Sequence, residues 1–288
     1  MNRLRFLGFL LLLALTLAAL AQRRRGGGRP GFSDGPDSVR TAREIPSNST
    51  GTPTWTNAPG FEHDVFTFAR IRYDRTGYGW GGGWATDLPD SDLNLSFRLQ
   101  QLTSMKVDPD ARWFRLTAPD LRHYPFIYIV EPGGLSLSPP EILALREYLH
   151  NGGFLWLDDF WGEEEWENCA DVMSQVLPNR AFTELSLDHP LYRCVFDIKA
   201  KYQVPAVNIG SASRYTGVTW ESRPSDTRQV HHRAIFDERD RLMVFATHNT
   251  DNGDGWEREG EDDYYFREFS EKTAYPLAIN VLYYIMTH

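Results

Sequence analysis

The chain has 288 residues and a formal net charge of −9 at pH 7. The first 60 residues contain eight of the 30 basic residues and three of the 39 acidic ones, so residues 61–288 carry a net charge of −14. Binding to nucleic acid needs clustered Lys and Arg, so this balance argues against such partners and favours cations or neutral polar ligands.

The N-terminus has the pattern of a signal peptide. Arg3 and Arg5 precede an apolar run over 6–20, and Ala19-Leu20-Ala21 matches an A-x-A cleavage pattern. We therefore expect an exported protein, periplasmic or extracellular, with no stable membrane insertion once residues 1–21 have been removed. An uncleaved anchor is the alternative, but the apolar run is short for a membrane span.

The rest of the chain divides into a linker and one domain. Residues 22–60 are rich in Arg, Gly, Pro, Ser and Thr, which predicts a disordered linker. Residues 61–288 have the length of a single domain.

Strands and helices alternate along this domain. In chain order, we expect strands at 64–73, 112–116, 126–130, 154–157 and 241–248. The helices are expected at 90–105, 138–150, 163–177 and 272–288. This alternation predicts an α/β fold with a doubly wound, mostly parallel sheet. Residues 183–240 are less regular and predict a β-containing excursion beside that sheet.

The loops that follow the predicted strands contain unusual residues. In an open α/β sheet, ligands bind outside the carboxyl ends of the strands, so these loops should converge on one edge. That edge would be acidic, aromatic and rich in glycine. The candidate ligand-binding residues are Tyr78, Trp80, Trp84, Glu131, Trp161, Asn249 and Trp256. Each loop alone also has a structural interpretation as turn or helix-capping chemistry.

Three residues of this edge are candidates for catalysis, namely Asp158, Asp159 and His248. The metal-ligand candidates are Asp158, His248, Asp251 and Asp254, so a divalent cation is a possible cofactor. The spacing does not match an EF-hand, a P-loop or a G-x-S-x-G elbow. His231 and His232 are adjacent on a predicted strand and should face opposite ways.

Cys169 and Cys194 are the two cysteines of the chain. An exported protein is permitted a disulfide, but the sequence does not show whether these residues lie within reach of each other.

Several segments together resemble a known family. They are "FARIRYD", "DSDLNLSFRLQQLTSMKV", "YPFIYIVEPGGLSLSPPEILALREYLHNGGFLWLDDFWG", "FATHNTDNGDGWE" and "YPLAINVLYYIM". Over roughly residues 64–288 the chain resembles the domain of unknown function family 4159, within the class I glutamine amidotransferase-like and trehalose-utilisation-like group. The resemblance implies a flavodoxin-like fold. Active amidotransferases of this group carry a nucleophilic cysteine where this chain has Asp158 or Asp159, so no amidotransferase activity is expected.

Three functions remain open. The first is a non-catalytic binding module for a polar small molecule or cell-envelope glycan, in which aromatic rings stack on sugars and carboxylates accept hydroxyl hydrogens. The second is a hydrolase at the carboxyl edge, assisted by a metal or using a carboxylate with His248. The third is a scaffold that docks to other proteins of an envelope assembly, which rests on analogy between folds.

Overall fold

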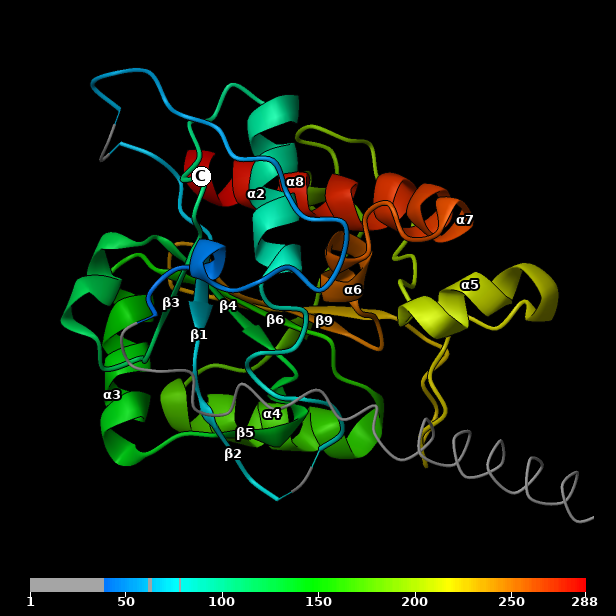
Figure 1. Ribbon diagram of the computed structural model, residues 1–288. Coiled ribbons are helices and arrows are strands. Elements are labelled where there is room, and N and C mark those ends of the chain that lie inside the picture. Colours follow the sequence, from blue (N-terminus) through cyan, green and yellow to red (C-terminus); the bar gives the residue numbers. More distant parts are fainter. Residues whose placement is uncertain (1–38, 62–63, 78) are drawn as a thin grey trace, which may run out of the picture. The chain divides into compact units, whose positions relative to one another are not determined.

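The computed structural model describes residues 39–61, 64–77 and 79–288 (Figure 1). The predicted signal peptide and residues 22–38 of the predicted linker lie outside the described residues, as does Tyr78. Within the described ranges, no helix combines the length and the apolar character that crossing a bilayer requires.

A seven-stranded, mostly parallel sheet forms the centre of the fold. In spatial order its strands are β3 (Arg112–Phe114), β1 (Ala69–Ile71), β4 (Phe126–Val130), β6 (Phe154–Asp158), β9 (Leu242–His248), β8 (His231–Phe236) and β7 (Thr183–Glu184). The first five are parallel, and β8 and β7 extend the sheet in antiparallel pairing. Taken in chain order, the parallel strands lie as 2-1-3-4-5, which is consistent with a flavodoxin-like fold. The strand order reverses between β1 and β4.

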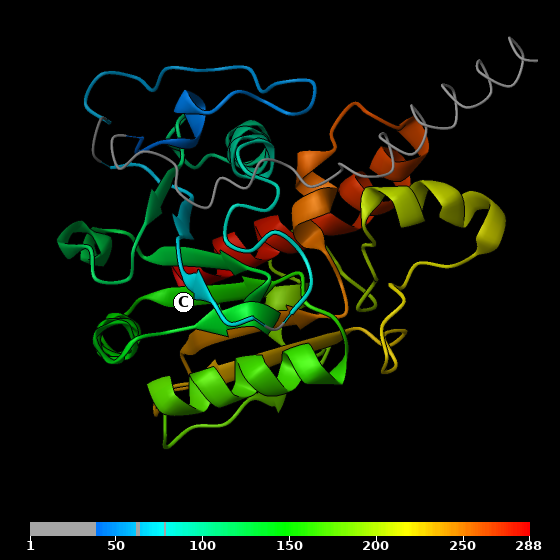
Figure 2. The ribbon, with the colours of Figure 1, turned by 60° about the horizontal axis from the view of Figure 1, so that its bottom comes forward.

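Helices cover both faces of this sheet. One face is covered by α2 (Asp90–Leu102), α6 (Asn252–Glu257) and α8 (Tyr275–Thr287), and the other by α3 (Pro139–His150) and α4 (Gly162–Val176) (Figures 1 and 2). The other regular elements are α5 (Val207–Thr216), α7 (Asp263–Tyr265), a π-helix at Phe266–Ala274 and an antiparallel pair of β2 (Asp74–Arg75) and β5 (Leu135–Ser136). Short 3-10 turns occupy Ala42–Glu44, Pro119–His123, Pro132–Gly134 and Pro190–Tyr192.

The central strands follow from their composition. All five residues of β4 are buried, as are all those of β6 and β9, which explains their nearly continuous apolar sequences. The helix between β4 and β6 begins with a capping box, in which the Ser138 amide donates to Glu141 Oε2 at 2.9 Å. The predicted helix and strands at these positions are confirmed within one or two residues.

The structure corrects the expected linker over residues 39–60. This segment belongs to the same compact unit as the sheet and buries Ala42 and Ile45. Its Ser47 hydroxyl donates to Asp90 Oδ1 at 2.6 Å, at the start of α2. The polar composition that suggested disorder instead supplies hydrogen bonds to the domain surface.

The structure shows three further features of the first strand, of residues 183–240 and of the two cysteines. The first strand covers only 69–71 of the expected 64–73, although the Arg72 amide still donates to the Phe114 carbonyl of β3 at 2.8 Å. Within 183–240, α5 is a helix that the sequence did not predict, and the rest adds β7 and β8 to the sheet edge. Cys169 and Cys194 are free thiols, so the permitted disulfide is not formed.

Candidate functional site

Three neighbouring parallel strands end in the same unusual backbone conformation. The first residue after β4 is Glu131, after β6 it is Asp159, and after β9 it is Asn249. Their φ angles are 51°, 57° and 61°, in the left-handed region. This conformation costs a residue other than glycine about 1–2 kcal/mol, and only Asp and Asn offset part of that cost through local hydrogen bonds. Backbone strain of this kind gathers where a fold positions functional side chains.

Glu131 lies at the point where the strand order reverses. Its Oε1 accepts a hydrogen bond from the Gly82 amide at 3.0 Å, and its Oε2 accepts one from the Gly83 amide. A Cβ atom at Gly81 would collide with this carboxylate, so the loop can approach only as glycine there. Burial raises the pKa of Glu131 to about 7, although the two amides oppose that rise.

Asp159 forms a pair with Glu131 at this edge. Its Oδ1 accepts a hydrogen bond from the Trp161 indole at 2.9 Å. Burial raises the pKa of Asp159 well above its ordinary value, and the charges of Glu131 and Glu221 raise it further. The pair therefore favours keeping a proton near neutral pH.

The glycine-rich loop after β2 lies against Glu131. The Trp80 amide donates to Glu165 Oε1 at 2.9 Å, and Arg75 donates to the Gly81 carbonyl at 2.6 Å. The Trp80 ring itself is 58% exposed, with the Arg223 guanidinium 4.8 Å from its centre. Trp80 is thus the aromatic candidate that the structure presents to solvent.

The other described aromatic candidates are buried. Trp84 stacks on Trp113 with ring centres 4.6 Å apart, and Trp256 packs edge-on against Trp156 beneath α6. Trp161 is 2% exposed. These three therefore differ from the open wall that the sequence suggested, because the turns and the short helix that carry them fold back onto the sheet.

Asp158 is surrounded by hydrogen-bond donors that hold the fold together, and it does not face a ligand site. Its Oδ1 accepts hydrogen bonds from the Thr247 hydroxyl at 2.5 Å and from the Asn252 side-chain Nδ2 at 2.8 Å. Its Oδ2 accepts from the Tyr128 hydroxyl at 2.9 Å and from the Gly253 amide at 3.1 Å. The side chain is completely buried, so these four donors fix the start of α6 against the sheet.

His248 does not pair with Asp158 as the sequence suggested. Thr247 points to the face that holds Asp158, so the next residue of β9 points to the opposite face. There His248 Nδ1 accepts from Arg233 at 3.0 Å, and Nε2 lies 2.9 Å from the Gly162 carbonyl. Burial lowers the pKa of His248 to about 3, so the ring is neutral.

Asn249 also has a structural role. Its Oδ1 accepts from the Gly162 amide and its Nδ2 donates to the Gln229 carbonyl, each at 2.8 Å. The predicted opposition of His231 and His232 agrees with the structure, in which His232 is buried and His231 reaches Glu184.

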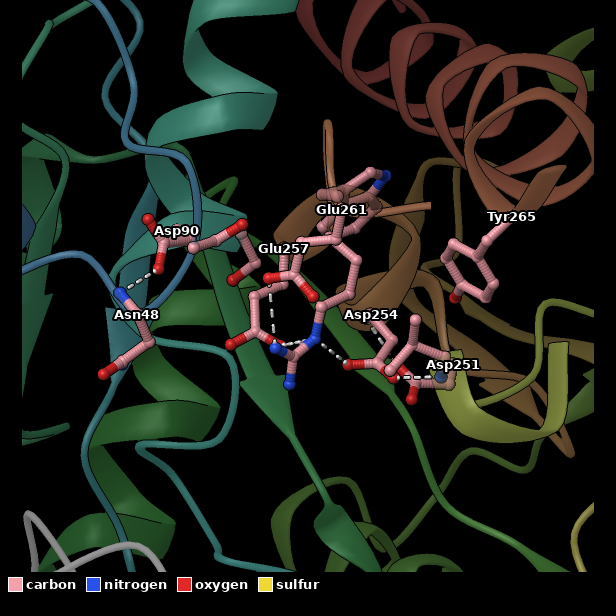
Figure 3. Close-up of polar contacts among 12 residues, drawn as sticks. Asn48, Asp90, Asp251, Asp254, Glu257, Glu261 and Tyr265 are labelled. Carbon is pink, nitrogen blue, oxygen red and sulfur yellow. Dashed lines mark hydrogen bonds and ion pairs between the residues drawn. The ribbon is translucent and has the colours of Figure 1, made fainter. Parts of the chain in front are cut away.

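The acids after β9 meet a residue that the sequence did not single out. Asp251 and Asp254 lie with Asp87, and one carboxylate oxygen of each lies within 4.8 Å of the others. All three side chains are buried. Figure 3 shows Asp251 and Asp254 side by side at the start of α6. Of the predicted metal ligands, the structure therefore groups Asp251 and Asp254, and it leaves out Asp158 and His248.

The sequence around Asp87 did not indicate a metal ligand, because an acid just before a helix is usually interpreted as a capping residue. Arg70 on β1 fixes the loop that carries it by donating to the Trp84 and Thr86 carbonyls at 3.0 and 2.7 Å. The contact with Asp251 then depends on two segments that are far apart in the chain.

A family model covers nearly all of these elements. The model of a domain of unknown function, DUF4159, matches residues 67–286. The chain belongs to the DUF4159 family. No curated protein matches this chain. The match runs from the start of β1 to the end of α8, so the DUF4159 domain contains the whole carboxyl edge described above, and residues 39–60 precede it.

The carboxyl edge of this DUF4159 domain offers two kinds of chemistry. The pair of Glu131 and Asp159 can accept hydrogen bonds or exchange a proton near neutral pH. The group of Asp87, Asp251 and Asp254 offers hard oxygen ligands. A thiolate nucleophile is not offered, because Cys169 is fully buried in α4 and burial raises the pKa of its thiol.

Proposed function

We propose that this DUF4159 domain binds a polar, hydroxyl-bearing ligand, of which a cell-envelope glycan is the class we favour, at the carboxyl edge between β1 and β4. The observation that carries the proposal is the pair of strained acids, Glu131 and Asp159, together with a loop whose Gly82 and Gly83 amides bind Glu131 and whose Trp80 ring is exposed. Each carboxylate has about four lone-pair sites, so acceptor positions remain on Glu131 after the loop amides are bound. Hydroxyl hydrogens would fill these positions while the ring packs on the C–H face of a sugar.

The place of this site in the fold supports the proposal. Ligands of doubly wound folds bind where the strand order reverses, and Glu131 lies at that point. The Tyr73 hydroxyl, just after β1, donates to the Glu131 carbonyl at 2.8 Å and holds the two strand ends together.

We also infer that the domain is a variant of the class I glutamine amidotransferase-like fold. Asp159 supports this inference, because it occupies a left-handed turn between β6 and α4, as a nucleophile does in a strand-turn-helix elbow. Asp159 would then stand in the place of the cysteine. Such a domain would bind its ligand without forming a covalent thioester at this turn.

A binding titration with matched variants tests the proposed ligand. We would titrate the protein with a panel of envelope oligosaccharides and follow both heat and melting temperature, since a ligand of the native state raises the latter. Trp80→Ala and Asp159→Asn are expected to abolish the response. Tyr215→Ala and Asp120→Asn remove an exposed ring and an exposed acid elsewhere and should leave it unchanged. Equal binding by Trp80→Ala, Asp159→Asn and the wild type would refute the site.

A second candidate function is hydrolysis by the two carboxyls. It is favoured by the Glu131 pKa of about 7 next to Asp159, since a general acid works best near the operating pH. Such an enzyme would cleave a panel of glycosides with a bell-shaped pH profile, and Glu131→Gln would remove its alkaline limb, which reports loss of the proton from the general acid. If the protein neither binds nor cleaves any sugar of these panels, the remaining function is that of a scaffold that docks to other proteins.

We infer export from the pattern of residues 1–21. N-terminal sequencing of the protein recovered from a bacterial periplasm should begin near Gln22. Recovery of an intact Met1 in the cytoplasmic fraction would contradict this inference.

A further inference from the structure

Asp87, Asp251 and Asp254 form a buried group of acids, which we call the acid triad. Their side chains are 2%, 4% and 6% exposed, and they come from the loop before α2 and from the first turn of α6. Their ligand oxygens lie within 4.8 Å of one another. Ca²⁺ binds oxygens at about 2.3–2.6 Å, so one ion can contact ligands up to about 5 Å apart. The spacing thus fits a single ion.

An unpartnered atom points into this group. Asp87 Oδ2 is buried and has no hydrogen-bond partner among the described residues. A Cβ atom built on Gly253 would collide with this oxygen and would stand 3.4 Å from Asp251 Oδ1. The missing side chain of Gly253 is therefore what lets Asp87 reach Asp251. A buried carboxylate oxygen without a donor is costly, so its position between other acids calls for a ligand.

The partners of the other two acids leave room for an ion. Asp251 Oδ1 accepts the Asp254 amide at 2.7 Å, and Asp254 Oδ2 accepts the Val207 amide at 2.6 Å. Each oxygen keeps a further lone pair for a cation. These amides also fix the carboxylates, so an ion would meet ligands that are already oriented.

The charge balance points the same way. Arg258 is the cation beside the triad, with its Nε 3.6 Å from Asp254 Oδ1. It lies closer to Glu257, at 2.7 Å, and also contacts Glu261 at 3.4 Å, as the labelled acids in Figure 3 show. Arg70, on the other side, is held by the buried Asp92. Each arginine thus has its own acid nearby, in Glu257 and Asp92, and neither is a dedicated partner of the triad.

We propose that Asp87, Asp251 and Asp254 hold one Ca²⁺ ion that ties the loop before α2 to the start of α6. Ca²⁺ fits better than Mg²⁺ because Mg²⁺ usually keeps several of its waters, and this group is almost closed to solvent. The site stands on its own contacts and does not depend on the polar ligand proposed above.

The test uses the metal alone. The protein would be stripped with EDTA, exchanged into metal-free buffer and titrated with CaCl₂ and, separately, MgCl₂, by calorimetry and thermal unfolding. We expect one Ca²⁺ per chain, a melting temperature that rises with Ca²⁺, and a weaker response to Mg²⁺. No response to Ca²⁺, or an equal or larger response to Mg²⁺, would overturn the proposal.

Variants separate a ligand from a structural acid. Asp87→Asn should lower the Ca²⁺ affinity at least about tenfold, yet in EDTA it should melt no lower than the wild type, because it removes a buried unpaired charge. Asp251→Asn should lose affinity in the same way while keeping the cap on α6, since Asn caps helices as well as Asp does. The matched control is Asp90→Asn, a buried acid three residues from Asp87 that has its own partners in Ser47 and Asn48. Its Ca²⁺ affinity should equal that of the wild type, and unchanged binding by Asp87→Asn would overturn the assignment.

Discussion

Replacement of Asp158 should separate an anchor of the fold from a reactive group. In Asp158→Ala, four buried donors lose their acceptor: the hydroxyls of Tyr128 and Thr247, the Asn252 side chain and the Gly253 amide. An unsatisfied buried donor costs about 1–3 kcal/mol. The hydroxyls can rotate, and removal of the buried charge returns part of the loss, so we expect a net decrease in the free energy of unfolding of about 4 kcal/mol.

Asp158→Asn should cost much less, about 1–2 kcal/mol. Its amide group would meet the Asn252 side chain, whose Oδ1 has no hydrogen-bond partner among the described residues. If the Asn252 amide turns over, this oxygen accepts from the new donor and three of the four bonds survive. The carboxamide can thus replace the carboxylate in shape and in most of its contacts.

Urea unfolding followed by circular dichroism measures both changes, provided that the slope with denaturant stays constant. The expected order is wild type, then Asp158→Asn, then Asp158→Ala, with a wide gap before the last. A loss below about 1 kcal/mol for Asp158→Ala would refute the role of Asp158 in fixing α6. Normal stability together with lost ligand binding would return Asp158 to the functional candidates.

Three other predictions concern thiols, the N-terminal segment and pH. In the native protein Cys194 should react with a thiol reagent well before Cys169, which is fully buried, and similar rates would show that α4 opens. Deletion of residues 39–60 should lower the melting temperature, because the burial of Ile45 alone is worth about 2 kcal/mol, and an unchanged melting temperature would restore the linker interpretation. Glu131 has a folded pKa of about 7 against an ordinary value of 4.5, so the folded state binds more protons between these values and the free energy of unfolding falls as pH rises through them. Urea midpoints from pH 5 to 8 should fall less steeply in Glu131→Gln than in the wild type, and identical slopes would contradict the raised pKa.

The central sheet could be predicted because its strands are continuous apolar runs. Residues 126–130, 154–157 and 241–248 have few polar interruptions, and the polar residues that follow them are the turns at the carboxyl edge. The position of Asp159 and Glu131 at that edge follows from strand order alone. The family resemblance is confirmed for the DUF4159 family by the match over residues 67–286.

The pairing of side chains could not be predicted in the same way. Whether Thr247 or His248 faces Asp158 depends on the register between β6 and β9, and a shift of one residue exchanges them. Asp87 meets Asp251 only through the packing of a loop against α6, which no local pattern encodes. Trp256 is buried because it lies in the short helix α6, which is separated from β9 by three residues and packs this ring against Trp156. The glycines of this segment suggested a loop instead of a helix.

The way in which the glycine-rich loop is held has a consequence for altering specificity. The loop is held by hydrogen bonds from the main-chain amides of Trp80, Gly82 and Gly83 to the carboxylates of Glu131 and Glu165. Side chains of the described loop residues 79–83 take no part in these bonds. Gly81 must stay because a Cβ atom would strike Glu131, whereas the Trp80 side chain is exposed. The residues that fix the loop backbone therefore differ from the side chain that is exposed to a ligand. A library of substitutions at Trp80 could change what the loop recognises while its backbone stays in place.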